Sequence, residues 1–181
     1  MSNYADIKLN DFSAGDGVSL TIYFQGCDKH CKGCHNPETW DFEKGHEFTD
    51  DTILYILENM IANGIYRNLA IMGGEPLHPR NHKNMFKLTE RVKKYRPDAK
   101  IYVWTGYTLD ELFELESSVL NAILICNVDY LIAGPYVEEE RDITLKWRGS
   151  RNQRIITKEE IEKYYLDKLT KKWYNLIKEW N

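Results

Sequence analysis

Strand-like and helix-like patterns alternate along most of the chain, and this alternation limits the possible folds more than any other feature of the sequence. Four short apolar segments rich in strand-forming residues lie at 19–24, 69–72, 101–104 and 130–133. Apolar residues at helical spacing follow the first three segments, at 51–63, 85–95 and 108–115. This order predicts a parallel sheet with covering helices, either an open sheet or part of a β/α barrel. A complete eight-unit barrel needs about 250 residues, so 181 residues can form only a partial one.

Two further features concern the predicted helices. Thr108 and Glu111 have the spacing of a capping box, which marks the start of the third helix. A long amphipathic helix is predicted at about 158–180. Its stripe consists of Ile161, Tyr164, Tyr165, Lys168, Leu169, Trp173, Leu176, Ile177 and Trp180. Packing on the chain's own sheet is the ordinary interpretation of such a stripe, and docking of a partner is the alternative.

Composition and charge restrict the class of protein. Apolar residues make up 43% of the chain, aromatic residues 13% and charged residues 29%, which is typical of an ordered domain. The sequence has no repeat, low-complexity tract or linker, so we expect one domain over 1–181 with its core at about 1–156. A net charge of −4 gives no reason to expect nucleic-acid binding. The N-terminus lacks a secretory signal and no long apolar run occurs, so we expect a cytoplasmic protein without membrane contact.

Three of the four cysteines lie within eight residues, directly after the first predicted strand. They are Cys27, Cys31 and Cys34. In a reducing compartment such crowding indicates metal ligation or redox chemistry. Iron–sulfur clusters normally take four thiolates, so three nearby cysteines leave one iron open to an outside ligand. Cys126 stands apart in an apolar run and is expected to be a buried structural cysteine.

The cysteine spacing alone leaves three alternatives. His30 or His35 could complete a structural zinc site with three cysteines. The run from Cys31 to His35 also matches the C-x-x-C-H pattern of haem attachment, although Cys27 then has no role. A dithiol redox pair is the third alternative, and it does not explain the third cysteine.

A glycine pair follows the second predicted strand. Residues 73–76 read Gly-Gly-Glu-Pro, and this position is the carboxyl end of a strand, where α/β proteins bind ligands. Glycines allow a ligand to approach the backbone closely, and the carboxylate of Glu75 suits a cationic amine. The segment comes one strand–helix unit after the cysteines, so we expect both at the same end of the sheet.

Together, the cysteine spacing and the glycine pair resemble the radical S-adenosylmethionine superfamily. The resemblance narrows to the family of activating enzymes of anaerobic (class III) ribonucleoside-triphosphate reductases, over about 1–156. The additional matching motifs lie at 24–27, 34–40, 76–79, 103–107 and 147–153. His35 stands where many members of that family have tyrosine, and His35-Asn36 is also similar to the activating enzyme of pyruvate formate-lyase.

The resemblance implies a fold, cofactors and partners. The fold is a partial (β/α)6 barrel with a long C-terminal amphipathic helix. A [4Fe–4S] cluster with one open iron binds S-adenosylmethionine and cleaves it reductively, and the resulting radical removes hydrogen from a glycine of the anaerobic reductase. An external one-electron reductant such as flavodoxin supplies the electron. A small-molecule radical enzyme and a zinc-bound interaction module are the remaining alternatives.

The resemblance also implies roles for individual residues. The cluster ligands are Cys27, Cys31 and Cys34. Gly33, Cys34 and His35 line the bound S-adenosylmethionine. The methionyl amine of this cofactor is held by Gly73, Gly74 and Glu75. Residues 148–151 have two interpretations, either a basic surface turn or arginines that contact the cofactor carboxylate or the partner. The acidic run 138–140 is expected to be a solvated loop without function.

Overall fold

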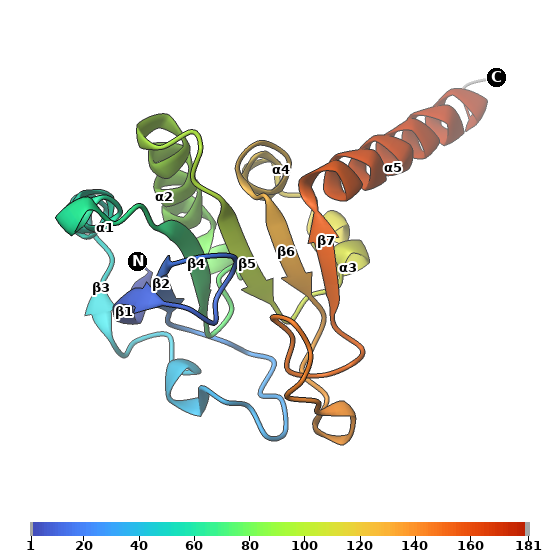
Figure 1. Ribbon diagram of the computed structural model, residues 1–181. Helices are drawn as coiled ribbons and strands as arrows, with labels where there is room; N and C mark the ends of the chain where they lie inside the picture. The colour runs from blue at the N-terminus through green and yellow to red at the C-terminus, as the bar shows by residue number, and fades with distance from the viewer. Residues whose placement is uncertain (1, 180–181) are drawn as a thin grey trace.

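The computed structural model describes residues 2–179, and these form one seven-stranded sheet beneath a layer of helices (Figure 1). The strands are β1 (Asn3–Asp11), β2 (Ser19–Phe24), β3 (His46–Glu47), β4 (Asn68–Gly73), β5 (Ile101–Thr105), β6 (Tyr130–Ala133) and β7 (Arg154–Thr157). Their order across the sheet is β3-β1-β2-β4-β5-β6-β7. The central strands β2, β4, β5 and β6 are parallel, whereas β1, β3 and β7 are added antiparallel at the two sides.

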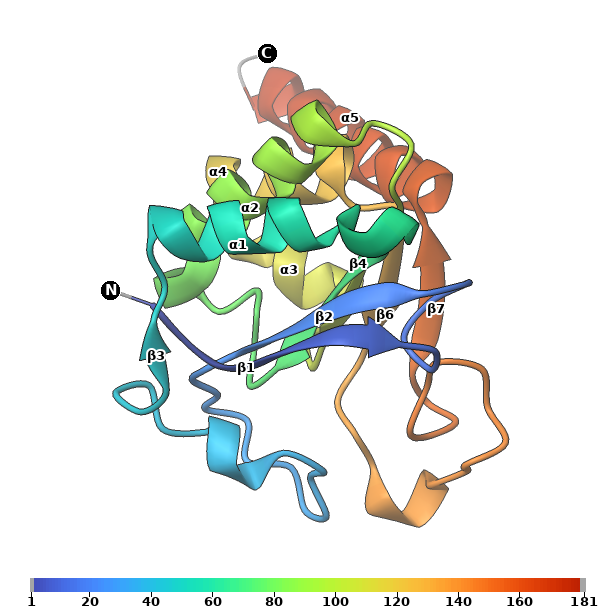
Figure 2. The same ribbon diagram turned by 60° about the vertical axis from the view of Figure 1, so that its left-hand side comes forward.

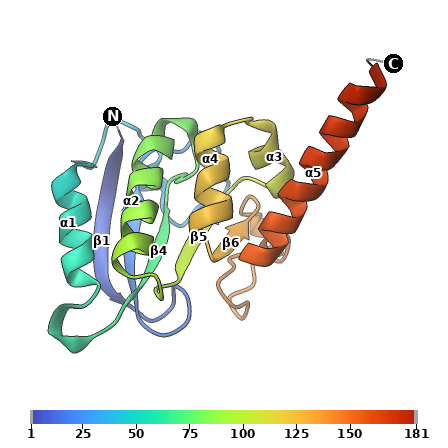
Figure 3. The ribbon, with the colours of Figure 1, turned by 90° about the horizontal axis from the view of Figure 1, so that it is seen from above.

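The helices lie on one side of the sheet (Figure 2), and α1, α2 and α4 run side by side over it (Figure 3). The α-helices are α1 (Asp50–Asn59), α2 (His82–Tyr95), α3 (Leu109–Glu114), α4 (Ser118–Ala122) and α5 (Lys158–Glu179). A π-helix follows α4 at Ile123–Asn127, and short 3-10 helices lie at Pro37–Thr39, Ala62–Gly64, Pro79–Asn81 and Glu138–Glu140. The predicted capping box of α3 is confirmed, because the Thr108 hydroxyl accepts from Glu111 N and the Glu111 carboxylate accepts from Thr108 N.

The two faces of the sheet carry different side chains because strand residues alternate in direction. Facing the helices is a row of paired, buried apolar residues that crosses the parallel strands and β7. The row consists of Ile22, Ile71, Val103, Leu131 and Ile156. The adjacent row on the opposite face consists of Thr21, Ala70, Tyr102 and Tyr130. The core therefore lies between sheet and helices, and the other face is free to carry polar and aromatic groups.

The predicted α/β architecture and C-terminal helix are confirmed, but the partial (β/α)6 barrel is not. Within residues 2–179 the sheet is open and only β2, β4, β5 and β6 are parallel. A parallel neighbour requires a long crossover, usually a helix. β1 joins β2 through the short segment 12–18, and 134–153 between β6 and β7 contains only a 3-10 helix. β1 and β7 therefore run antiparallel to β2 and β6.

Among residues 2–179, no helix combines the length and the apolar character needed to cross a bilayer. The predicted stripe of the C-terminal helix continues to Trp180, which lies outside the described residues. The remaining part of α5 packs on the protein through Ile161 and Tyr165, which are fully buried. The prediction that the stripe packs on the chain's own domain is thus confirmed for the first turns of α5.

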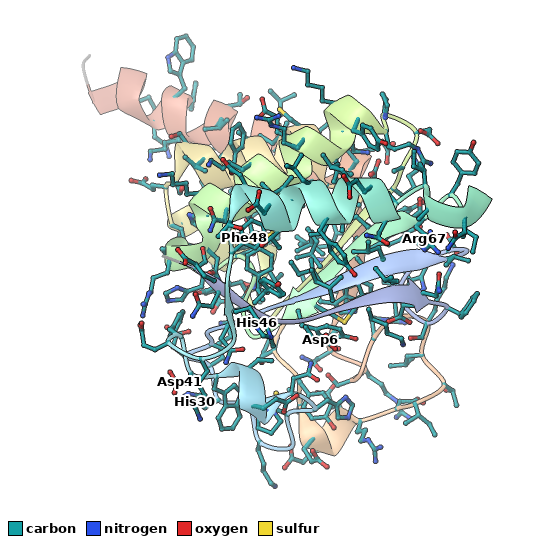
Figure 4. All side chains as sticks on the ribbon, turned by 90° about the vertical axis from the view of Figure 1, so that its left-hand side faces the viewer. Asp6, His30, Asp41, His46, Phe48 and Arg67 are labelled. Carbon is teal, nitrogen blue, oxygen red and sulfur yellow. The ribbon has the colours of Figure 1, made fainter. Side chains whose placement is uncertain are left out.

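Arg67 closes the C-terminal end of α1 from the end of the sheet farther from His30 (Figure 4). Its side chain is 3% exposed, and Nη1 donates to the carbonyls of Asn59, Ala62 and Ile65 at 2.8, 3.1 and 3.2 Å. Nε donates to Asn10 Oδ1 at 2.9 Å. Carbonyls at a helix end lack intrahelical donors, so the guanidinium satisfies groups that are otherwise unpaired.

We predict that Arg67→Met lowers the free energy of unfolding by about 2–3 kcal/mol, because it removes charge-assisted hydrogen bonds from buried carbonyls. Urea unfolding followed by circular dichroism measures this loss. Arg91→Met on the exposed side of α2 is the matched control and should change stability by less than about 0.5 kcal/mol. Equal effects of the two substitutions would show that Arg67 has no special structural role.

Candidate iron–sulfur site

A cavity of about 450 Å³ lies at the carboxyl ends of the parallel strands, lined by residues at and after the ends of β2, β4, β5 and β6 and by residues of the β1–β2 connection. The loop after β2 contributes Cys27, Cys31 and Cys34 to its wall, together with His35. The loops after β4 and β5 contribute Gly73, Gly74, Glu75, Thr105 and Gly106, and the loop after β6 contributes Gly134 and Tyr136. In Figure 2 the cysteine loop (light blue) and residues 136–153 (orange) lie on the side of the sheet away from the helices. The sequence prediction that cysteines and glycines meet at one end of the sheet is confirmed.

The cysteine loop folds back on the segment that follows it. Gly26 N donates to Thr39 O at 2.7 Å and Cys27 N donates to Trp40 O at 3.0 Å. Within the loop, Cys34 N donates to Cys31 O at 3.1 Å. All three cysteines are partly buried. These backbone bonds fix the loop, and Asn36 N also donates to Cys34 Sγ at 3.4 Å. Such hydrogen bonds to sulfur are compatible with cluster ligation, so the thiols remain available as ligands.

The two histidines of the loop have aromatic neighbours. The His30 ring lies 4.6 Å from the Trp40 ring, and the His35 ring lies 5.4 Å from that of Tyr136, between centroids. In the described part of the chain, no three His, Cys, Asp or Glu side chains converge closely enough to hold one metal ion. Thiolates that bind a cubane each hold a different iron and do not need to converge on one point.

Burial raises the pKa of the Cys27 thiol, and the neighbouring Glu75 carboxylate raises it further. Backbone N–H groups of Lys29 and His30 act in the opposite direction. A thiol must lose its proton to bind a metal, so binding at Cys27 is coupled to proton release. A bound iron ion would stabilise the Cys27 thiolate through its positive charge and so offset the effects of burial and of Glu75.

The glycine pair is required by the chain's own packing. A Cβ on Gly73 would lie 2.4 Å from Phe24 O, and one on Gly74 would lie 2.5 Å from Gly26 O. Gly73 also has φ +114°, which side chains rarely adopt. Gly74 N donates to Phe24 O at 2.8 Å and Glu75 N donates to Gly26 O at 2.7 Å. The glycines thus allow the start of the cysteine loop to lie directly against the end of β4.

The carboxylate of Glu75 joins the ends of β4 and β5. It is 1% exposed, and Oε1 accepts from Thr105 Oγ1 at 2.7 Å and from Leu77 N at 3.0 Å. Oε2 accepts from Gly106 N at 2.7 Å. Burial raises the pKa of Glu75 to about 7, although these hydrogen bonds and the charge of Lys29 lower it. Both carboxylate oxygens therefore already have partners within the protein, which sequence reasoning did not anticipate.

Lys29 connects the cysteine loop to the loop after β5. Its Nζ lies 4.0 Å from the centre of the Tyr107 ring and 3.8 Å from Glu111 Oε1. Its side chain is only 18% exposed and its Cδ lies close to Gly106. No sequence pattern indicates this contact, because a lysine between cysteines is equally compatible with a solvent-exposed position.

Residues 136–153 cover the cavity from the β6 side. Lys32 Nζ donates to Glu139 Oε1 at 3.0 Å, and a Cβ on Gly33 would collide with the Glu138 carboxylate. The expectation of a solvated loop holds for Glu139, whose side chain is 70% exposed, whereas Glu138 is half-buried against Gly33 of the cysteine loop. Trp104 Nε1 donates to Trp147 O at 2.7 Å, which fixes the far end of the segment.

Of the two arginines in the 148–151 turn, Arg148 lies at the cavity wall. Arg148 Nη1 donates to Gln153 O at 3.1 Å, and Arg141 also lines the cavity. Arg151 instead pairs with Asp142 and is exposed. Arg148 thus lines the cavity and Arg151 lies at the surface, while contact of Arg148 with a cofactor or partner stays a prediction.

Cys126 is exposed, so the prediction of a buried structural cysteine is wrong. It lies in the π-helix, where Ile123 and Leu124 point into the core and are fully buried. Successive residues of a helix face different directions, so an apolar run does not bury each of its members. Cys126 is also absent from the residues that line the cavity.

These features define a class of protein. It is an open α/β domain in which the loop after the first parallel strand carries three thiols that are available as metal ligands. The sequence model of the 4Fe–4S single cluster domain matches residues 13–156. This match supports an iron–sulfur cluster as the group bound by the domain.

Comparison with known proteins narrows the class. The chain is 39% identical over 154 residues to an anaerobic ribonucleoside-triphosphate reductase-activating protein of Haemophilus influenzae, covering 84% of this chain and 96% of that protein. The protein of the same name from Escherichia coli K12 is 36% identical over 152 residues, 83% and 96% of the two chains. The one from Enterobacteria phage T4 is 34% identical over 155 residues, 84% and 92%. The chain belongs to the family of anaerobic ribonucleoside-triphosphate reductase-activating proteins, with a 4Fe–4S single cluster domain.

We predict that Glu75→Gln changes the pH dependence of stability in the metal-free protein. The folded-state pKa of Glu75 is about 7, above its ordinary value of 4.5. The folded state therefore binds the proton more tightly, and the contribution of Glu75 to stability falls by roughly 3 kcal/mol as the pH rises through this interval. Glutamine cannot titrate, so urea unfolding should show the variant losing less stability than the wild type between pH 4.5 and 7.

The exposed Glu90 provides the control for this measurement. Glu90→Gln should leave the pH profile parallel to that of the wild type. A Glu75→Gln profile that is likewise parallel would contradict the raised pKa.

Proposed function

We propose that the chain is a radical S-adenosylmethionine activase that generates the glycyl radical of an anaerobic ribonucleoside-triphosphate reductase. The observation that carries the proposal is that three free cysteines and the glycine pair 73–74 line the same cavity at the carboxyl ends of the strands. The relatives' names supply the target, since they describe activation of this reductase. Residues 1–181 act as one domain in this proposal.

The donor set fits a cluster with one open iron. Cys27, Cys31 and Cys34 line the cavity, and the remaining cysteine, Cys126, is exposed outside it. Iron–sulfur clusters otherwise use four thiolates, so three leave one position for an outside ligand. The cavity volume of about 450 Å³ lies within the range of small-molecule sites, roughly 300–1,000 Å³. S-adenosylmethionine is the ligand we assign to this space.

The chain's own residues would hold and shield the cofactors. We assign the methionyl amine to the backbone of Gly73, Gly74 and Glu75, because the Glu75 carboxylate is already bound by Thr105, Gly106 and Leu77. Gly33, Cys34 and His35 would line the other side of the cofactor. When bound, the cluster and S-adenosylmethionine supply reductive cleavage to methionine and a 5′-deoxyadenosyl radical that removes a glycine Cα hydrogen.

The walls of the cavity limit the access of water to this chemistry. Tyr136, Trp104 and Trp147 stand around it, and Trp104 Nε1 donates to Trp147 O at 2.7 Å, which ties residues 136–153 to the end of β5. A radical intermediate requires protection from solvent and side reactions. Partly buried aromatic side chains provide that protection on the β6 side.

Several components lie outside the chain. An external one-electron reductant such as flavodoxin would supply the electron, and the location would be the cytoplasm, without nucleic acid or membrane as a partner. The activating enzyme of pyruvate formate-lyase remains the alternative type of activase because of His35-Asn36. A small-molecule radical enzyme is a weaker alternative, since the relatives are named as activators of a protein.

Electron paramagnetic resonance tests the reaction and the partner together. The reconstituted protein is mixed anaerobically with the anaerobic reductase, S-adenosylmethionine and reductant. We expect a glycyl doublet that requires all four components. A doublet that forms only with pyruvate formate-lyase would reassign the partner, and release of methionine without a protein radical would contradict the activase proposal.

We predict that Cys27→Ala, Cys31→Ala and Cys34→Ala each abolish cofactor cleavage, because each removes a ligand of one iron. Anaerobic iron and sulfide analysis should show loss of the intact cluster in all three. Cys126→Ala is the matched control and should retain full cluster content and cleavage, since its thiol is exposed and remote from the cavity. Loss of the cluster in Cys126→Ala with the fold intact would contradict the ligand assignment.

A further inference from the structure

Two lysines lie between the cysteines of the loop, and their surroundings differ. Lys29 follows Cys27 by two residues, and its side chain is only 18% exposed. Lys32 directly follows Cys31 and is 79% exposed, where it pairs with the equally accessible Glu139. Burial of a charged group costs free energy unless partners compensate the charge. The position of Lys29 therefore requires partners, whereas solvent stabilises the charge of Lys32.

The partners of Lys29 come from the loop after β5 and the start of α3. Its Nζ lies 4.0 Å from the centre of the Tyr107 ring and 3.8 Å from Glu111 Oε1. Its aliphatic part packs on Gly106, where an added Cβ would lie 2.6 Å from Lys29 Cδ. A lysine side chain usually extends its ammonium group into water. That of Lys29 instead lies in the wall of the cavity, together with the cysteines.

The groups around Lys29 are mainly negative. The buried Glu75 carboxylate accepts from Gly106 N at 2.7 Å, the same residue on which Lys29 packs. The charge of Lys29 lowers the pKa of Glu75, and Glu75 in turn raises the pKa of the Cys27 thiol. These three groups therefore lie within range of one another's electrostatic fields. Cluster thiolates would add further negative charge, so an electron that reduces the cluster would enter an anionic region.

We propose that Lys29 raises the reduction potential of the cluster at Cys27, Cys31 and Cys34, an inference that rests on the proposed function. Reduction adds one electron from an external reductant to the cluster, and no bond forms or breaks. A fixed cation stabilises the more negative reduced state more strongly than the oxidised state. The potentials of iron–sulfur clusters depend on such local charge and on solvent exposure. The Glu111 carboxylate fixes the ammonium group and also partly opposes its effect.

An anaerobic redox titration of the reconstituted full-length protein tests this role of Lys29. Dithionite is the reductant, and electron paramagnetic resonance measures the reduced cluster in the absence of S-adenosylmethionine. Lys29→Met keeps the aliphatic chain but removes the charge. We expect the equilibrium constant for reduction to fall about tenfold, which is a shift of about 59 mV to more negative potential. Lys32→Met is the matched control and should leave the potential unchanged, because the Lys32 charge is screened by solvent.

Two further variants separate the effect of charge from a structural effect. Lys29→Arg retains the positive charge and should keep the potential of the wild type. Glu111→Gln removes the opposing carboxylate and should shift the potential in the positive direction, by less than tenfold in the equilibrium constant because Glu111 is half exposed. Glutamine also serves at this position of a capping box, so the start of α3 at Thr108 should stay intact. A damaged loop does not explain shifts of opposite sign.

Iron and sulfide analysis of each variant precedes the titration. A Lys29→Met protein with an intact cluster and the wild-type potential would overturn the proposal, as would equal shifts in Lys29→Met and Lys32→Met. A Lys29→Arg protein shifted as far as Lys29→Met would also overturn it. If Lys29→Met holds no cluster, Glu111→Gln decides, and an unchanged or more negative potential would contradict the role of Lys29. A wild type without iron and sulfide would instead contradict the proposed function.

Discussion

The contact between the end of β4 and the start of the cysteine loop governs the rest of the site. Gly73 and Gly74 lie directly against the backbone of residues 24–26, and Glu75 N is hydrogen-bonded to Gly26 O at 2.7 Å. The buried carboxylate of Glu75 then holds the next strand end through Thr105 and Gly106. Three neighbouring parallel strands are thus tied together at their carboxyl ends. This framework positions the loop that carries the three thiols, and backbone N–H groups of the loop donate to the sulfurs of Cys27 and Cys34.

Much of this arrangement follows from the sequence. The central strands show apolar runs because their helix-facing residues, such as Ile22, Ile71 and Val103, are fully buried. Helical periodicity located α1 and α2, whose inner faces complete that core. The cysteine spacing and the glycine pair could be placed at one end of the sheet because consecutive parallel strands end on the same side. Family membership rests on the same motifs and is supported by the comparisons.

The features that the sequence did not indicate depend on contacts between distant residues. β1 alternates polar and apolar residues within a mostly polar stretch, and β7 is only four residues long, so neither has a distinct strand pattern. The acidic run at 138–140 reaches the cysteine loop only because the chain after β6 folds back across the cavity. Likewise, Glu75 has its partners in the loop after β5, thirty residues away in the chain. No local pattern encodes such pairings.

The direct test of the proposed open iron is electron–nuclear double resonance on the reduced, reconstituted protein with S-adenosylmethionine labelled with ¹⁵N at the methionyl amine. A vacant cluster corner requires hyperfine coupling from that label to the cluster, and the coupling should disappear when unlabelled cofactor replaces it. Coupling from a histidine nitrogen of His30 or His35, with none from the label, would mean that the protein itself caps the fourth iron. In that case the thiol loop would serve a structural or electron-transfer cluster.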